Sequence, residues 1–154
     1  TDEIENLRNI MIALAELSRV LPVLLPLHPR TRKILSRQEW CSELQSEKGL
    51  NIIEPISYLD FICLERHAKI ILTDSGGVQK EAYFVGTPCI TLRNETEWPE
   101  TIESGWARLV GSDREAIVDA ALNFELPSLS KSSLYGDGNS SRLILDILQY
   151  SSKY

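Results

Sequence analysis

The stretch LTDSGGVQKEA, residues 72–82, holds the residues best suited to binding an anion. An apolar run gives way to Asp-Ser-Gly-Gly, and a helix-like pattern resumes at once. Adjacent glycines let a backbone come within hydrogen-bonding distance of a ligand, and the first N–H groups of the following helix are unpaired and carry partial positive charge. The spacing therefore favours a phosphate or diphosphate site at Ser75, Gly76 and Gly77.

A purely structural reading of this turn also fits the sequence. In it, Ser75 caps the helix and the two glycines only permit a tight turn. The stretch is neither G-x-G-x-x-G nor a P-loop, so spacing alone does not decide. Glu81 favours a ligand, because it stands about one and a half helical turns further on, where its carboxylate could reach a sugar hydroxyl. Its alternative is an ordinary solvated helix residue.

Two cationic residues follow other apolar runs. His28 ends the run VLLPL, where an imidazole could face a diphosphate or could instead cap a helix or bond to the backbone. Arg93 follows PCITL, and it either supplies a positive charge to phosphates or is a surface residue at a strand end. If these runs are parallel strands, both residues lie at the carboxyl edge of the sheet, where ligands bind.

The elements that must position these residues alternate between short apolar runs and amphipathic segments. Such alternation is what a parallel sheet covered on both faces requires. The predicted fold is therefore α/β, a Rossmann-like doubly wound parallel sheet in a single domain, residues 1–154. The predicted strands are 23–27, 51–55, 69–73, 88–92 and 106–111, and the predicted helices are 2–18, 30–44, 57–68, 77–85, 98–105, 114–124 and about 139–150.

The composition indicates one acidic domain. A chain of 154 residues is long enough for one full core and too short for two ordinary domains. Sixteen Lys and Arg against 22 Asp and Glu give a net charge of −6, which argues against a general affinity for nucleic acid or anionic membranes. No apolar run approaches the roughly 20 residues of a membrane span, and the first residues lack the features of a signal peptide, so a cytoplasmic protein is expected.

The cysteines and histidines do not follow the pattern of a metal site. Cys41, Cys63 and Cys89 are odd in number and far apart, and Cys63 and Cys89 lie inside apolar segments, which fits reduced, buried thiols better than disulfides. His28 and His67 are the only histidines, and no paired cysteines stand at zinc-ligand spacing. Neither a metal nor another cofactor is expected.

The motifs together resemble a known enzyme family. LTDSGGVQKEAYFVGTPCITLRNETEWPETIESGWARLVG, with PLHPRT before it and YGDGNSS after it, is similar to the carboxy-terminal domain of the non-hydrolysing UDP-N-acetylglucosamine 2-epimerases. The most specific parts are TDSGG-x-Q-x-E-A, R-x-x-T-E-x-P-E and YGDG, and the match runs over nearly the whole chain. The resemblance implies two Rossmann-like domains arranged as in B-type glycosyltransferases, of which this chain is the nucleotide-binding half and a piece of a longer protein.

The resemblance assigns roles to the residues around the glycine turn. It implies that Ser75, Gly76 and Gly77 bind the diphosphate of UDP or a UDP-sugar, and that Glu81 holds the ribose. It also implies that Phe61, counted back from the turn, stacks on the uracil, although the residues alone favour a core position for this side chain. Under the same resemblance Arg93 stays a candidate for the phosphates.

His28 is the one residue of the chain to which the resemblance gives a part in catalysis. Protonated, it would stabilise the charge of the departing diphosphate. The family reaction eliminates UDP to leave a 2-acetamidoglucal and re-adds it with the opposite configuration at C2. The carboxylates that move the proton lie in the family's amino-terminal domain. That domain is outside this chain, so the 154 residues alone are expected to be inactive.

One motif departs from the family pattern, and another has both a functional and a structural explanation. Many members have T-E-R-P-E where this chain has Trp98, and TEW with SGWARLVG is similar to relatives that act on UDP-2,3-diacetamido-glucuronic acid. The YGDG loop, residues 135–138, resembles the family's loop near the uridine, yet a glycine-rich turn before a helix explains it structurally as well.

The sequence also leaves other functions open. The donor domain of a B-type glycosyltransferase would hold a UDP-sugar by similar chemistry but pass the sugar to an acceptor. A non-catalytic nucleotide-binding domain and a hydrolysing relative fit the same residues, because exclusion of water depends on closure between both domains. Full-length members are usually homodimers, which makes a homodimer one expected assembly of the full-length protein.

Overall fold

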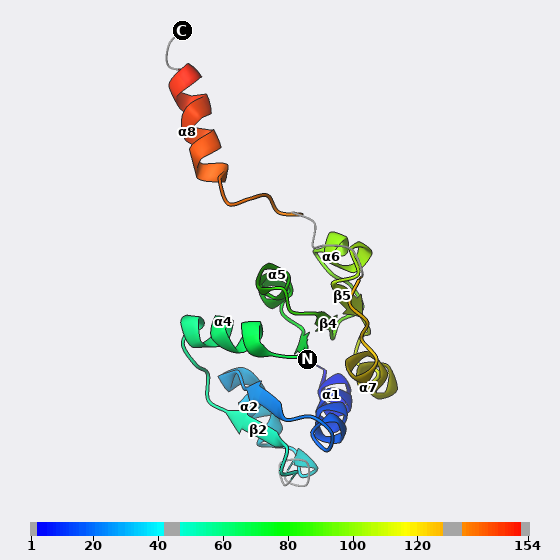
Figure 1. The fold of residues 1–154 in the computed structure, drawn as a ribbon. Helices are drawn as coiled ribbons and strands as arrows, with labels where there is room; N and C mark the ends of the chain where they lie inside the picture. Colours follow the sequence, from blue (N-terminus) through cyan, green and yellow to red (C-terminus); the bar gives the residue numbers. More distant parts are fainter. Residues whose placement is uncertain (1–2, 42–46, 128–133, 152–154) are drawn as a thin grey trace.

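The computed structural model describes residues 3–41, 47–127 and 134–151, and it shows helices and strands in regular alternation (Figure 1). Their order agrees with the order predicted from the apolar runs. The helices are α1 (Ile4–Leu17), α2 (Pro29–Leu35), α4 (Tyr58–His67), α5 (Gly76–Val85), α6 (Pro99–Glu103), α7 (Arg114–Leu122) and α8 (Ser140–Ser151). The strands are β1 (Val23–Pro26), β2 (Leu50–Ile53), β3 (Ile71–Thr73), β4 (Cys89–Thr91) and β5 (Ala107–Leu109).

The helix predicted at 30–44 is shorter in the structure. α2 ends at Leu35, and residues 42–46 lie outside the described part of the chain. Leu35 is the residue that α2 buries, and the four residues after it are polar or charged, so no apolar face continues along the helix. Pro29 sets the other end, because a proline at the first helical position needs no N–H partner, and His28 occupies the N-cap before it.

The strands pair in parallel, as the predicted fold requires, and they form two sheets. β1 pairs with β2, with Val23 opposite Leu50, while β3, β4 and β5 form a second sheet with β4 in the middle. β4 has a neighbour on each side and is fully buried. β1 and β3 each have one paired neighbour among the described residues, and most of their side chains stay partly exposed.

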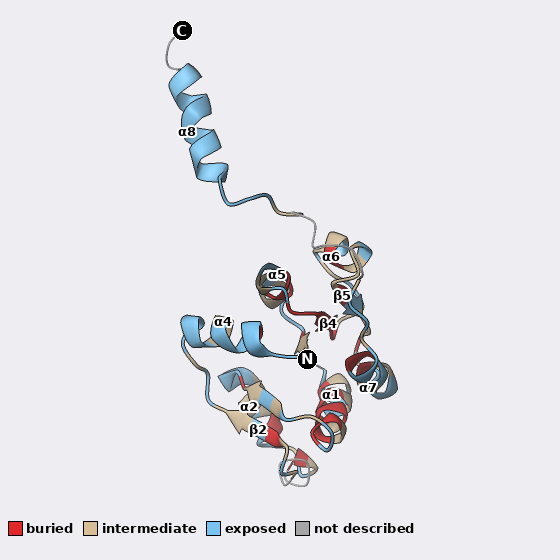
Figure 2. Ribbon diagram, in the orientation of Figure 1, coloured by how far each residue is buried: buried red, intermediate tan, exposed pale blue. Residues whose placement is uncertain are grey.

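The core gathers around α1, α7 and β4 (Figure 2). α1 packs against α7, and its buried side chains recur with helical spacing, which explains why this amphipathic segment folds as a helix. Large side chains that are fully buried in this cluster come from four elements far apart in the sequence: Met11, Leu35, Ile90 and Ile117.

α8 differs from the other helices in its exposure. Residues 140–150 are all exposed, including the apolar side chains of Leu143, Ile147 and Leu148 (Figure 2). An amphipathic helix normally covers such a face by packing. In the part of the chain that the structure describes, no helix is long and apolar enough to cross a membrane.

Gly49, just before β2, tests how closely α1 and β2 approach. A Cβ added here would overlap the backbone carbonyl oxygen of Ser18, which cannot move aside like the end of a flexible side chain. We expect Gly49→Ala to lower the free energy of unfolding by about 3 kcal/mol, because overpacking displaces the backbone. Urea unfolding measures this, with Lys48→Ala at the exposed neighbouring position as control. An unchanged midpoint in Gly49→Ala would contradict the close packing.

Candidate functional site

The glycine turn lies between the end of β3 and the start of α5. Ser75 occupies the N-cap position of α5, but its side chain makes no capping hydrogen bond. Its backbone N–H instead donates to Thr73 Oγ1 at 3.0 Å. Neither Gly76 nor Gly77 has a positive φ, because both are already helical. Ser75 is therefore the N-cap residue that the structural reading expects, without a capping hydrogen bond from its side chain, and the backbone conformation of the turn does not require glycine.

The space around the two glycines distinguishes them. A Cβ at Gly77 would meet only the Ser75 hydroxyl, at 3.8 Å, which is an ordinary contact. A Cβ at Gly76 would lie 3.0 Å from the Glu97 carboxylate, which is a tight contact. Packing against Glu97 therefore favours glycine at this position. The reading in which the glycines only permit a tight turn is wrong for Gly77. The backbone at Gly77 is exposed and leaves room for a ligand to approach closely.

The first turn of α5 offers backbone donors at the same place. The first hydrogen bond within the helix runs from the Gln79 N–H to the Ser75 carbonyl at 3.3 Å, so the N–H groups of Gly76, Gly77 and Val78 precede it. The dipole of this ten-residue helix adds partial positive charge at its N-terminus. Such an arrangement suits a phosphate or another anion.

The loop 94–98 is fastened to α5 by a buried side chain. Gln79 is fully buried, and its Oε1 accepts a hydrogen bond from the Thr96 hydroxyl at 2.6 Å. Thr96 Oγ1 accepts from the Trp98 backbone N–H at 3.0 Å, and the Trp98 indole N–H donates to the Gly76 carbonyl at 2.8 Å. Trp98, which departs from the T-E-R-P-E pattern, thus supports the first turn of α5.

An aromatic cluster covers α5 next to this loop. Lys80 Nζ lies 4.1 Å from the ring centre of Trp98 and 4.5 Å from that of Tyr135, both within cation–π range. These contacts dock the YGDG turn onto α5. Gly136 and Gly138 have φ values of 80° and 83°, so this turn does need its glycines, as the structural reading holds. The proximity of the turn to a uridine stays a prediction.

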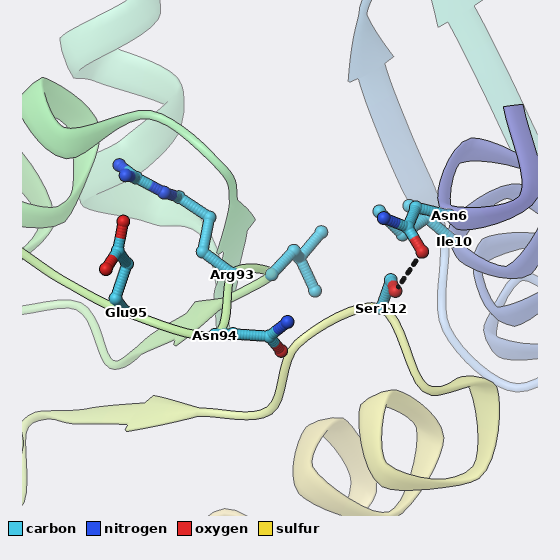
Figure 3. Close-up of a pocket in the computed structure, with 7 residues that line it drawn as sticks. Asn6, Ile10, Arg93, Asn94, Glu95 and Ser112 are labelled. Carbon is cyan, nitrogen blue, oxygen red and sulfur yellow. Dashed lines mark hydrogen bonds between the residues drawn. The ribbon is translucent and has the colours of Figure 1, made fainter. Parts of the chain in front are cut away.

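Arg93 is paired with a carboxylate at the end of β4. Its Nη1 donates to the two oxygens of Glu97 at 2.9 and 3.2 Å. The backbone N–H of Glu97, followed by Arg93, holds the pKa of this carboxyl below its usual value. Arg93 also lines an open cavity of about 320 Å³, and its side chain extends away from the hydrogen-bonded pair Asn6 and Ser112 (Figure 3). A contact between Arg93 and a phosphate stays a prediction.

His28 caps α2. Its Nδ1 accepts a hydrogen bond from the Arg30 N–H at 3.2 Å, and the residue is exposed. The capping role considered for this histidine is therefore confirmed. A neutral ring whose Nδ1 accepts carries its proton on Nε2, which is then available as a donor. His28 follows β1 and so belongs to a different sheet from the glycine turn.

Phe61 and Glu81 lie on α4 and α5, two helices that pack together. Phe61 is half-buried, and among the described residues it is not one of the side chains that form or flank the core clusters. Glu81 is half-buried and interacts with Tyr58 and Glu65 of α4. The uracil and ribose roles given to Phe61 and Glu81 stay predictions.

Glu65 is a buried carboxyl that is absent from the predicted site residues. Its side chain is 3% exposed, and burial, followed by the charge of Glu81, raises its pKa to about 7. The sequence carried a weak signal for it, because Glu65 follows Phe61 by four positions and so lies on the same face of the helix. Gln79 and Thr96 belong to the two most specific motifs but were given no role, since their contact joins two separate segments.

The family is decided by a match that spans nearly the whole chain: the family model described as UDP-N-acetylglucosamine 2-epimerase matches residues 1–149. The chain belongs to the UDP-N-acetylglucosamine 2-epimerase family. A UDP-N-acetylglucosamine 2-epimerase homolog of Methanococcus maripaludis is 46% identical over 149 residues, covering 97% of this chain and 41% of that protein. A UDP-2,3-diacetamido-2,3-dideoxy-D-glucuronate 2-epimerase of Pseudomonas aeruginosa is 43% identical over 154 residues, covering 96% of this chain and 41% of that protein.

Solved structures of UDP-N-acetylglucosamine 2-epimerases share this fold. The enzyme of Methanocaldococcus jannaschii matches with a TM-score of 0.86 and 40% identity, covering 97% of this chain and 42% of that chain. A structure of the same enzyme in complex with UDP-GlcNAc and UDP gives a TM-score of 0.85. The predicted family and α/β fold are confirmed, and the chain spans about two-fifths of the length of the relatives it matches.

Removal of the Trp98 indole N–H tests whether its hydrogen bond to the Gly76 carbonyl supports the first turn of α5. Trp98→Phe keeps an aromatic ring beside Lys80 but loses the donor to the Gly76 carbonyl. We expect the free energy of unfolding to fall by about 1 kcal/mol, the usual contribution of one hydrogen bond. Urea unfolding measures the change, and Trp98→Ala, which also removes the ring, should lose more. Equal stability of Trp98→Phe and the wild-type chain would contradict a supporting role of this hydrogen bond.

Proposed function

We propose that this chain, residues 1–154, is the UDP-sugar-binding, carboxy-terminal domain of a UDP-N-acetylglucosamine 2-epimerase, with α8 as its closing helix. The full-length protein then interconverts UDP-GlcNAc and UDP-ManNAc by elimination and re-addition of UDP. The observation that carries the proposal is the exposed, donor-rich N-terminus of α5 at Gly77. A relative that is 40% identical has a structure in complex with UDP-GlcNAc and UDP, which supports the same ligand class here.

The diphosphate is held at the glycine turn in this proposal. The N–H groups of Gly76 and Gly77 donate to its oxygens, and hydrogen bonds to a charged acceptor are stronger than neutral ones. The Ser75 hydroxyl can join them because it is not used as a helix cap. Phe61 and Glu81, on the neighbouring helices α4 and α5, bind the uracil and the ribose.

His28 donates to the diphosphate through Nε2 in this proposal, because its Nδ1 is already an acceptor. A proton on Nδ1 would break the hydrogen bond from the Arg30 N–H that this atom accepts. Because Nδ1 is the acceptor, the ring proton is on Nε2. The Nε2–H group can then donate to the departing UDP and stabilise its charge. Arg93 contributes a positive charge if the phosphates displace Glu97 from it.

The rest of the enzyme supplies the chemistry at C2. About three-fifths of the length of the relatives lies outside the matched region, which leaves room for an amino-terminal domain with the carboxylates that move the proton. The exposed apolar side chains of α8 and the partly exposed strands β1 and β3 support a larger protein, because further chain would bury them. A homodimer in the cytoplasm belongs to the same proposal.

A second candidate function differs only in the sugar. The Pseudomonas aeruginosa relative named UDP-2,3-diacetamido-2,3-dideoxy-D-glucuronate 2-epimerase is 43% identical to this chain, and Trp98 belongs to the TEW motif that favours this substrate. Epimerisation assays of the full-length protein with both UDP-sugars distinguish the two. If only the UDP-diacetamido-glucuronate is epimerised, this sugar nucleotide replaces UDP-GlcNAc as the proposed substrate.

UDP binding to the 154-residue chain tests the site directly. We expect UDP, but not ADP, to shift the backbone amide NMR signals of Ser75, Gly76, Gly77 and Glu81. The dissociation constant should be on the order of 1 mM, because one domain supplies only part of the cleft. Equal shifts with ADP, or no shifts at the turn in a folded sample, would contradict a uridine-diphosphate site.

Gly77→Ala separates binding from stability in the same experiment. The added methyl group has space in the protein, so we expect the free energy of unfolding to change by less than about 1 kcal/mol. It would stand where the phosphate must approach the backbone, so UDP should bind at least about tenfold more weakly. Wild-type affinity in Gly77→Ala would show that the ligand does not approach this N–H group.

The 154-residue chain should not epimerise UDP-GlcNAc on its own. The proton at C2 needs positioned carboxylates, which the proposal places in the other domain. A coupled assay for UDP-ManNAc, with a full-length family member as positive control, measures this. Detectable turnover by the purified chain would contradict the division of roles between the domains.

A further inference from the structure

Glu65 is a buried titratable side chain to which the proposed reaction gives no role. It is 3% exposed on α4, and its backbone carbonyl accepts a hydrogen bond from the Thr87 hydroxyl at 2.7 Å, which fixes this turn of α4 beside the start of β4. With its carboxyl ionised, neither oxygen has a donor among the described residues. A buried carboxylate without a donor is strongly unfavourable.

Protonation of the Glu65 carboxyl removes this unfavourable buried charge. When Glu65 is protonated, its hydroxyl can donate to the carboxylate of Glu81, with which it interacts across the packed helices α4 and α5. Tyr58, about two turns earlier on α4, interacts with the same carboxylate. Glu81 therefore interacts with two groups of one helix that can each donate a hydrogen bond to it.

We propose that Glu65 is a positioning residue for nucleotide binding, whose protonated carboxyl, together with Tyr58, fixes the Glu81 carboxylate for the ribose. The proposal rests on the ribose-binding role of Glu81 in the proposed function. A carboxylate has about four acceptor positions, so two donors from α4 leave others for ribose hydroxyls. Holding the carboxylate in place before the nucleotide arrives reduces the entropy lost on binding.

The groups that face Glu65 come from three elements. They are Tyr58 on α4, Glu81 on α5 and Cys89 on β4. Burial raises the pKa of the Cys89 thiol to about 12, and the charge of Glu81 raises the pKa of Tyr58, so both keep their protons near pH 7. Glu65 is therefore the group of this set that changes charge in this range.

Loss of the shared proton should weaken UDP binding as the pH rises. A second negative charge beside Glu81 repels its carboxylate and removes one of its donors. With a pKa of about 7 for Glu65, about 76% of the chains hold the proton at pH 6.5 and about 3% at pH 8.5. If only the protonated chains bind well, UDP binds up to about 25-fold more weakly at pH 8.5.

Carbon-13 NMR of glutamate-labelled chain measures the pair without any ligand. We expect one glutamate carboxyl signal to titrate near pH 7, to be absent in Glu65→Gln, and to titrate at lower pH in Glu81→Gln because the neighbouring charge is gone. The absence of any glutamate that titrates above about pH 6 would overturn the shared proton. A titration unchanged in Glu81→Gln would overturn it as well.

UDP affinity at pH 6.5 and 8.5 then tests the positioning role. Glu65→Gln keeps a donor to Glu81 but cannot ionise, so its affinity should differ little between the two pH values while the wild-type chain loses affinity. The variant also serves as the control for the ionisation of UDP itself. Parallel pH profiles in the two chains would overturn the positioning role and leave the proposed function standing. No UDP binding to either chain at either pH would contradict the proposed function.

Discussion

The candidate site depends on the contact between α5 and the loop that follows β4. Gln79 is fully buried in α5, and a buried carbonyl oxygen is costly unless it accepts a hydrogen bond, so the bond from the Thr96 hydroxyl to Gln79 Oε1 keeps the loop in place. The loop in turn brings Trp98 to the Gly76 carbonyl and places the Glu97 carboxylate where a Cβ of residue 76 would stand close to it. The N-terminus of α5 is thereby fixed on one side before a ligand arrives, which lowers the entropy lost on binding.

An acidic chain can offer this anion site because the positive charge that matters is local. The two cationic side chains near the turn are already engaged, Arg93 with Glu97 and Lys80 with the rings of Trp98 and Tyr135. The N–H groups and the dipole of α5 then supply the fixed positive potential. The net charge of −6 acts over the whole surface and does not cancel a contact made at hydrogen-bonding distance.

The packing of the chain changes from its centre to its outer elements. β4 and the buried faces of α1 and α7 form a dense core, whereas α8 and the strands β1 and β3 keep apolar groups in contact with solvent. Apolar surface of this kind usually marks an interface. The division agrees with a chain that spans about two-fifths of the length of its relatives.

The sequence by itself determined the order of helices and strands, the parallel α/β fold, the family and the position of the glycine turn. These follow from apolar periodicity and short motifs, which are local in the chain. The tertiary structure alone decided that the described strands form two sheets, that Gly76 is packed while Gly77 is open, and that Trp98 supports the turn. It also decided that Glu65 is buried beside Glu81. Each of these depends on groups that are distant in sequence and meet only when the elements pack, and no local pattern records such a meeting.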